Sequence, residues 1–127
     1  MHDTQRIDPA VLQQLKEDLG GDQEILEELV DDFIRDTPDL LAEMRQALAA
    51  TDLPVLLRTA HTLKSTSAVL GALPLSRLSQ ELEEAIHTAV DPSRTEKFAP
   101  LVEKICQLFD ETAEEMRAVI TSDRLDG

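Results

Sequence analysis

Apolar residues recur along this chain every three or four positions, which is the spacing of one face of an α-helix. Three segments between Gly and Pro breaks show this spacing most clearly. Their apolar positions are Ile25, Leu26, Leu29, Phe33, Leu40, Leu41, Met44 and Leu48; then Leu75, Leu78, Leu82 and Ile86; then Leu101, Val102, Ile105, Cys106, Phe109, Ala113, Met116 and Ile120. β-Branched residues are scattered rather than set in alternating runs, so the pattern predicts helices and no sheet.

Oxygen-bearing caps and prolines mark where five helices should begin. The predicted starts are Asp8 with Pro9, Asp22, Asp52, Pro74, and Asp91 with Pro92. Glycine ends the first helix, at Gly20 and Gly21, and the third, at Gly71. Pro38 lies inside the second helix, which is therefore predicted to be kinked there or split in two.

Together these elements predict an all-α fold. Four long amphipathic helices with short connections form an up-down-up-down four-helix bundle, and an additional short N-terminal helix lies across one end. At 127 residues, the chain is expected to be a single domain, residues 1–127, with frayed tails at 1–7 and 122–127. The composition agrees, because only 2% of the residues are aromatic and few glycines interrupt the helices.

The charge balance argues against several classes of partner. The chain has 26 acidic and 12 basic side chains, for a formal charge of −14, so nucleic acid and an anionic membrane surface would repel it. No apolar run approaches the roughly 20 residues of a membrane span, and no signal-peptide pattern stands at the N-terminus. The lone Cys106 is expected to be an unpaired buried side chain, which fits a cytoplasmic location.

His61 stands apart from the apolar stripe of its own helix. That stripe consists of Leu56, Ala60, Leu63, Ser67 and Leu70. At 100° per residue, His61 lies about 130° from the centre of the stripe, so its ring should point outward. The same count gathers around the ring Leu57, Arg58, Lys64, Ser65 and Ala68.

The residues around His61 suit an anion. Arg58 and Lys64 stand three positions before and after it. Two nearby cations disfavour imidazolium, so the ring is predicted to be neutral and nucleophilic at pH 7. A phosphoryl group carries a charge of roughly −2, for which Lys64 is a point-charge partner and the Ser65 hydroxyl a candidate donor. The small side chains of Ser65 and Ala68 leave the ring accessible to a large partner.

Residues 61–72, HTLKSTSAVLGA, resemble the signature of histidine-containing phosphotransfer (HPt) domains, H-x-x-K-G-[SA]-[SA]-x-x-x-G-A. The matching positions are His61, Lys64, Ser67, Gly71 and Ala72. Residues 75–85, LSRLSQELEEA, are similar to the family's L-x-x-L-C-x-x-L-E segment, with Ser79 where Cys is common and Glu83 at the final position. The resemblance covers nearly the whole chain. Ser65 departs from the signature, because the family usually has Gly at this position.

The resemblance implies a phosphorelay carrier rather than an enzyme with its own ATP site. In such a domain His61 would accept a phosphoryl group from a receiver-domain aspartate and pass it to another receiver. Lys64 would steady the phosphate, and Glu83 would hydrogen-bond the far ring nitrogen. The alternative interpretation of Glu83 is a solvated carboxylate. The phosphate-supporting or docking residues would be Leu57, Arg58, Ser65, Ala68 and Gly71.

The implied partners are response-regulator receiver domains and a hybrid histidine kinase, which a monomer would meet through a modest, transient interface. No cofactor is expected on this chain, because the Mg²⁺ that in-line transfer needs should belong to the receiver's acidic pocket. The sequence also offers no three metal ligands at suitable spacing and no P-loop.

Two other interpretations stay open. One is the dimerisation and phosphoacceptor domain of a sensor histidine kinase, in which the residue after the histidine is usually acidic. Here that residue is Thr62, and no ATP-binding segment follows. The other is a helical adaptor without catalysis, whose His61 never carries phosphate. His87 and His2 are weaker candidates, since His87 suits a surface pair with Glu83 and His2 lies in the predicted tail.

Overall fold

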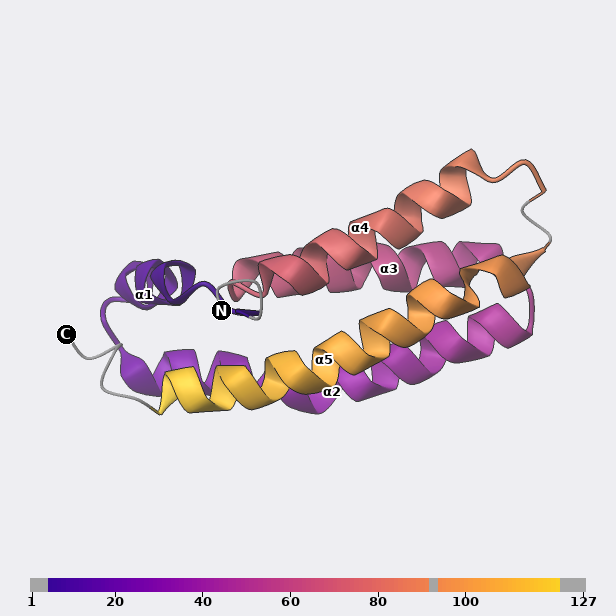
Figure 1. Cartoon of the computed structure of the whole chain (residues 1–127). Helices are drawn as coiled ribbons and strands as arrows, with labels where there is room; N and C mark the ends of the chain where they lie inside the picture. Colours follow the sequence, from indigo (N-terminus) through magenta and orange to yellow (C-terminus); the bar gives the residue numbers. More distant parts are fainter. Residues whose placement is uncertain (1–4, 92–93, 122–127) are drawn as a thin grey trace.

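The computed structural model describes residues 5–91 and 94–121. Within these ranges the chain forms five α-helices, one short 3₁₀-helix and no strand (Figure 1). In chain order they are α1 (Pro9–Asp18), α2 (Gln23–Ala49), α3 (Leu53–Val69), α4 (Leu73–Thr88), the 3₁₀-helix η2 (Thr95–Phe98) and α5 (Ala99–Ile120). The predicted all-α class is confirmed.

Helices α2 to α5 run alternately up and down as a four-helix bundle, also as predicted (Figure 1). α3 and α4 pack against each other, α2 packs on α3, and α5 closes the bundle against α2 and α4. α2 has 27 residues and α5 has 22, against 17 in α3 and 16 in α4. The longer pair extends past the α3–α4 turn, and α1 lies beside this overhang at one end of the bundle (Figure 1).

Local capping explains three of the helix starts. The side chains of Asp8, Asp22 and Asp52 accept backbone N–H groups of the first helical turn at 3.0 to 3.3 Å. These bonds satisfy donors that would otherwise lack a partner. α4 begins at Leu73, one residue before the predicted start at Pro74, which occupies a first-turn position where its missing N–H costs nothing.

The predicted start of the fifth helix at Asp91 is wrong. α5 begins well after it, and the turn that precedes α5 is the 3₁₀-helix η2. Phe98 and Thr95 are buried there, and the Thr95 hydroxyl donates to the carbonyl of Leu48 at 2.9 Å. This contact holds the connection across the end of α2 before α5 starts. Pro92 lies outside the described residues.

Pro38 does not split the second helix. α2 is continuous from Gln23 to Ala49, and Pro38 is exposed on its outer side. A proline inside a helix removes one backbone hydrogen bond and crowds the preceding turn. Buried residues on both sides of it, among them Ile34 and Leu41, hold α2 against the rest of the bundle across that gap.

The core is built from the apolar stripes of the four long helices. Fully buried side chains include Leu26, Met44, Leu56, Leu63, Leu75, Leu82, Ile105 and Met116. Phe33 and Phe109 meet edge to face with ring centroids 5.9 Å apart. Cys106 is free and buried as predicted, and burial raises the pKa of its thiol.

Two residues of the predicted α2 stripe are not in the core. Ile25 and Leu29 are both exposed. Each directly precedes a buried residue, Leu26 or Val30, so each stands at the edge of the stripe. The periodicity identified the correct buried face of α2 but included two exposed positions at its edge.

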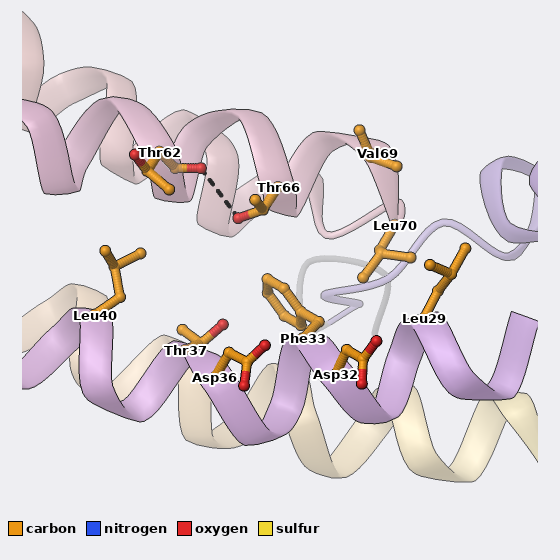
Figure 2. A pocket seen from close by; sticks show the side chains of 10 residues that line it. All are labelled: Leu29, Asp32, Phe33, Asp36, Thr37, Leu40, Thr62, Thr66, Val69 and Leu70. Atoms are coloured by element: carbon orange, nitrogen blue, oxygen red, sulfur yellow. Dashed lines mark hydrogen bonds between the residues drawn. The ribbon is translucent and has the colours of Figure 1, made fainter.

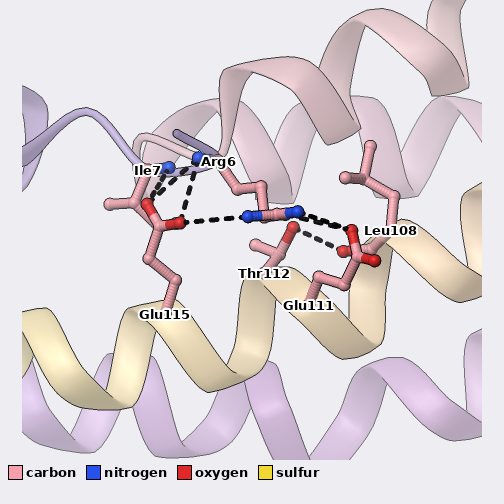
Figure 3. A network of polar contacts seen from close by, with 6 residues as sticks. All are labelled: Arg6, Ile7, Leu108, Glu111, Thr112 and Glu115. Carbon is pink, nitrogen blue, oxygen red and sulfur yellow. Dashed lines mark hydrogen bonds and ion pairs between the residues drawn. The ribbon is translucent and has the colours of Figure 1, made fainter. Parts of the chain in front are cut away.

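The segment before α1 is packed against α5 rather than frayed (Figure 3). Ile7 is 1% exposed, and its N–H donates to the carboxylate of Glu115 at 2.9 Å. The Arg6 N–H donates to the same carboxylate, and the Arg6 guanidinium pairs with Glu111 at 3.0 Å. The prediction of a frayed tail over residues 1–7 is wrong for Arg6 and Ile7, because their partner lies on a distant helix. Residues 1–4 and 122–127 lie outside the described part of the chain.

Gly71 joins this N-terminal segment to the end of α3. Its φ of +79° lies in the region that favours glycine, and it ends α3 as predicted. A Cβ at this position would lie 2.9 Å from the carbonyl oxygen of Asp8. The Asp8 N–H donates to the Gly71 carbonyl at 2.9 Å. Glycine is therefore required both by the turn and by the close approach of Asp8.

Candidate functional site

His61 lies on the outer face of α3. Its side chain is 61% exposed, whereas its neighbour Ala60 and the next apolar residue, Leu63, are buried. The predicted outward direction of His61 is confirmed. The ring is therefore open to a partner.

A carboxylate from the neighbouring helix holds the ring. Glu83 on α4 contacts Nδ1 of His61 through Oε2 at 3.0 Å, and its Oε1 forms an ion pair with Nζ of Lys64 at 3.0 Å. Glu83 is only 14% exposed, because α4 packs along α3 with the adjacent Leu82 in the core. The interpretation of Glu83 as a solvated carboxylate is therefore wrong.

Glu83 remains ionised at neutral pH. Burial raises its pKa, but hydrogen bonding and charge attraction from Lys64 and His61 lower it by more, so the pKa lies below the usual value of 4.5. An ionised carboxylate can only accept hydrogen bonds. In the neutral ring, Nδ1 of His61 must then carry the proton that it donates to Glu83, and Nε2 keeps its lone pair.

The two cations near His61 are each paired with a carboxylate. Arg58 binds Glu43 on α2, and Lys64 binds Glu83. The sequence argument for a neutral ring counted the two cations and left out these carboxylates. The arrangement of protons on the ring follows instead from the hydrogen bond between Nδ1 and Glu83.

The other predicted site residues fall into two groups. Ser65 and Ala68 are exposed on the same face as His61, and Leu57 is half-buried against the core. Gly71 is buried against Asp8 and Val11. Its place among the phosphate-supporting or docking residues is therefore wrong, since it acts on the backbone and not on a partner. His87 is exposed on α4, and His2 lies outside the described residues.

Sequence reasoning missed an apolar groove on the flank of α3, and Figure 2 shows the side chains that line it. The groove lies between α2 and α3 and has a volume of about 420 Å³. Its lining includes Leu29, Phe33, Leu40, Thr62, Thr66 and Val69. Val69 is 58% exposed and Leu29 is 37% exposed. Thr62 follows His61 along α3 and points about 100° further round the helix, so the groove lies on the flank of α3 next to the face that carries the ring. The signal available in the sequence was Val69, an apolar residue outside the stripe of its own helix.

Within residues 5–91 and 94–121 there is no helix that could cross a bilayer. The same part of the chain contains no group of three His, Cys, Asp or Glu side chains that could hold a metal ion.

The model of the Hpt domain family matches residues 28–121, a range that includes His61, Lys64 and Glu83. The chain belongs to the Hpt domain family. Among solved structures, this Hpt domain is similar to histidine-containing phosphotransfer protein B (HptB) from Pseudomonas aeruginosa PAO1. The sequence identity is 29%, the TM-score is 0.75, and the match covers 91% of this chain and 94% of that one. No protein of curated function matches the chain.

Membership of this family places the Hpt domain in histidine phosphotransfer within phosphorelay signalling. Proteins of this family are phosphocarriers, which agrees with the prediction of a phosphorelay protein.

Proposed function

We propose that this Hpt domain carries a phosphoryl group on Nε2 of His61, accepting it from the aspartate of one receiver domain and passing it to another. The observation that supports the proposal most is the hydrogen bond between His61 Nδ1 and the ionised Glu83. It leaves Nε2 with a lone pair on an exposed ring, which is what a nucleophile needs.

Transfer begins when the Nε2 lone pair attacks the phosphorus of the receiver's aspartyl phosphate. The N–P bond forms as the P–O bond to the aspartate breaks, and the aspartate leaves as a carboxylate. The ring becomes cationic, and its Nδ1–H stays bonded to Glu83, which stabilises the new charge. Passing the group onward reverses these bonds at a second receiver. We expect Mg²⁺ on the receiver, and not on this chain, to neutralise the phosphoryl charge.

Lys64 would bind Glu83 before transfer and the phosphoryl group during transfer. Before transfer its ammonium is bound to Glu83 at 3.0 Å. It stands three residues after His61, within one helical turn, so it can turn from Glu83 to an oxygen of the incoming phosphoryl group. The ammonium then takes over contacts that the phosphoryl oxygens leave on the receiver, so the oxygens stay paired with a cation as the group crosses, which lowers the barrier.

A receiver domain would dock on the outer face of α3 and on the groove beside it. The face consists of Leu57, His61, Ser65 and Ala68, and the groove, whose lining Figure 2 shows, lies on the neighbouring flank toward α2. The exposed side chains of Val69 and Leu29 offer apolar area there. Such a surface suits a short-lived complex, since transient signalling encounters bury less than about 1,200 Å². Receivers of response regulators and of a hybrid histidine kinase are the partners that fit.

The experiment incubates the domain with phosphorylated receivers and follows the label. His61→Gln should abolish acid-labile, base-stable labelling and keep the helix content, because Gln is a polar residue that suits an exposed helical position. His87→Gln is the matched control on α4 and should be labelled like the wild type. Label on His61→Gln, or loss of label from His87→Gln, would show that another histidine is the acceptor.

Two further variants separate chemistry from docking. Lys64→Ala should slow transfer on the order of tenfold, which corresponds to about 1.4 kcal/mol at the transition state. Val69→Asp should raise the receiver concentration needed for half-maximal rate more than it lowers the rate at saturation. An unchanged rate in Lys64→Ala would show that its charge does not act on the phosphoryl group.

The two alternative interpretations make different predictions in solution. A domain that sediments as a monomer of 14.1 kDa fits the proposal, whereas a stable dimer would favour the phosphoacceptor domain of a sensor kinase. A wild type that no receiver labels would favour the helical adaptor.

A further inference from the structure

Ser65 has an exposed hydroxyl that is not used in a hydrogen bond within the described part of the chain. It stands one turn after His61, at the position where the Hpt signature usually has Gly. Thr59 and Thr66, on the same helix, donate their hydroxyls to backbone carbonyls at 2.9 and 3.1 Å. Ser65 makes no such bond with any residue that the structure describes.

Lys64 and Ser65 lie on opposite flanks of His61. At 100° per residue, Lys64 falls about 60° to one side of His61 and Ser65 about 40° to the other. The Lys64 flank faces α4, because Lys64 reaches Glu83 there. The Ser65 flank therefore faces away from α4, toward α2.

The nucleophilic nitrogen of the ring faces away from α4, as the Ser65 flank does. Nδ1 faces α4, where Glu83 accepts its hydrogen bond at 3.0 Å, so the edge that carries Nε2 faces away from α4. Arg58, a cation on that flank, is already bound to Glu43. The hydroxyl of Ser65 is a donor on this flank that no other contact occupies.

We propose that the Ser65 hydroxyl donates a hydrogen bond to the phosphoryl group on His61 and lengthens the lifetime of the phosphorylated state. The inference rests on the proposed function and deepens it, because Lys64 would hold the phosphoryl group from one flank and Ser65 from the other. A domain with Gly at this position lacks the second donor. Ser65 thus makes this Hpt domain a longer-lived store of the phosphoryl group.

Spontaneous loss of the group is hydrolysis. Water attacks phosphorus, the P–N bond breaks, Nε2 takes back the electron pair, and both water protons leave with inorganic phosphate. In a loose transition state the phosphoryl group has partly departed as a metaphosphate-like species, so its oxygens carry less charge. A donor bonded to those oxygens therefore stabilises the phosphorylated domain more than it stabilises the transition state.

The test uses potassium phosphoramidate as the phosphate donor, so that no receiver is involved. Its phosphoryl group moves to Nε2 of His61 and ammonia leaves. After the donor is removed, phosphohistidine and inorganic phosphate are followed by phosphorus NMR at mildly alkaline pH. Ser65→Ala removes only the hydroxyl and should shorten the lifetime by about three- to tenfold, the effect of one hydrogen bond.

Ser65→Gly removes the side-chain carbon as well, so it distinguishes an effect of side-chain size from an effect of the hydrogen bond. The lifetime of its phosphohistidine should be as short as in Ser65→Ala. In urea-unfolded protein, where residue 65 no longer lies beside the ring, both variants should have the lifetime of the wild type. Equal phosphohistidine lifetimes in the wild type and Ser65→Ala would overturn the inference. A lifetime that is shortened only in Ser65→Gly would overturn it as well. A wild type that phosphoramidate does not label at His61 counts against the proposed function itself, whereas unchanged variants of a labelled domain count against Ser65 alone.

Discussion

Glu83 uses its two oxygens to hold two different groups, the ring of His61 and the ammonium of Lys64. Both contacts are 3.0 Å long, so one carboxylate orients the nucleophile and places the nearest cation. A substitution at any of the three residues changes the surroundings of the other two. Their effects on transfer should therefore not be additive.

Glu83→Gln should flatten the acid dependence of stability. Because the pKa of Glu83 in the folded state lies below 4.5, its ionised form stabilises the fold above the unfolded-state pKa. That stabilisation is lost as the pH falls through the folded-state pKa. The free energy of unfolding of the wild type should fall more steeply than that of Glu83→Gln once the pH drops below about 4.5. Urea unfolding over a series of pH values measures both curves, and parallel curves would contradict this expectation.

Ser67 is buried, and its hydroxyl has no hydrogen-bond partner among the residues that the structure describes. Ser67→Ala should leave the free energy of unfolding unchanged or raise it by up to about 1 kcal/mol, because the unpaired hydroxyl costs desolvation. Ser79→Ala is the matched control. That buried hydroxyl donates to the Leu75 carbonyl at 2.9 Å, so its loss should destabilise by about 1 kcal/mol. A larger loss in Ser67→Ala than in Ser79→Ala, measured by urea unfolding, would show that Ser67 has a partner in solution.

At the scale of the elements, Gly71, which ends α3, can be compared with Gly20, which follows α1. Gly71→Ala and Gly20→Ala each place a Cβ at a φ of +79°, which costs about 1–2 kcal/mol. At position 20 the Cβ meets nothing within 4 Å, whereas at position 71 it lies 2.9 Å from the carbonyl oxygen of Asp8. Gly71→Ala should therefore lose about 1 kcal/mol more than Gly20→Ala. Thermal unfolding of the two variants measures the difference, and equal losses would mean that Asp8 does not approach Gly71 closely in solution.

The sequence predicted helix boundaries well where the cause is local. The caps at Asp8, Asp22 and Asp52 bind backbone groups two or three residues further along, so each can be recognised from its own segment. The start of α5 depends instead on the bond from Thr95 to Leu48, which lies 47 residues away. No local pattern of residues contains that information.

At the scale of the whole molecule, the segment before α1 links α5 to the end of α3, because Arg6 and Ile7 bind Glu115 (Figure 3) and Asp8 binds Gly71. Ile7→Ala should lower the free energy of unfolding by about 2–4 kcal/mol, because truncation of a buried side chain leaves a cavity. Gln5→Ala, two residues earlier and exposed, is the control and should change it by less than about 0.5 kcal/mol. If urea unfolding finds the same stability for both variants, the segment does not pack on α5 in solution.

The candidate site also combines local and long-range causes. Helical periodicity alone placed His61 on the outer face of α3, and the motif resemblance pointed to Glu83. The pairing of Arg58 with Glu43 and the groove between α2 and α3 depend on how those two helices align. That alignment is set by packing of the whole bundle, and a single sequence does not display it.

The central claim, phosphorylation of His61 at Nε2, is tested most directly by NMR that correlates phosphorus with the ring nitrogens of the phosphorylated domain. We predict phosphorus bonded to Nε2 of His61, with Nδ1 still carrying the proton that it donates to Glu83. Phosphorus on Nδ1 of His61, on another residue, or on no residue of the chain would contradict the account.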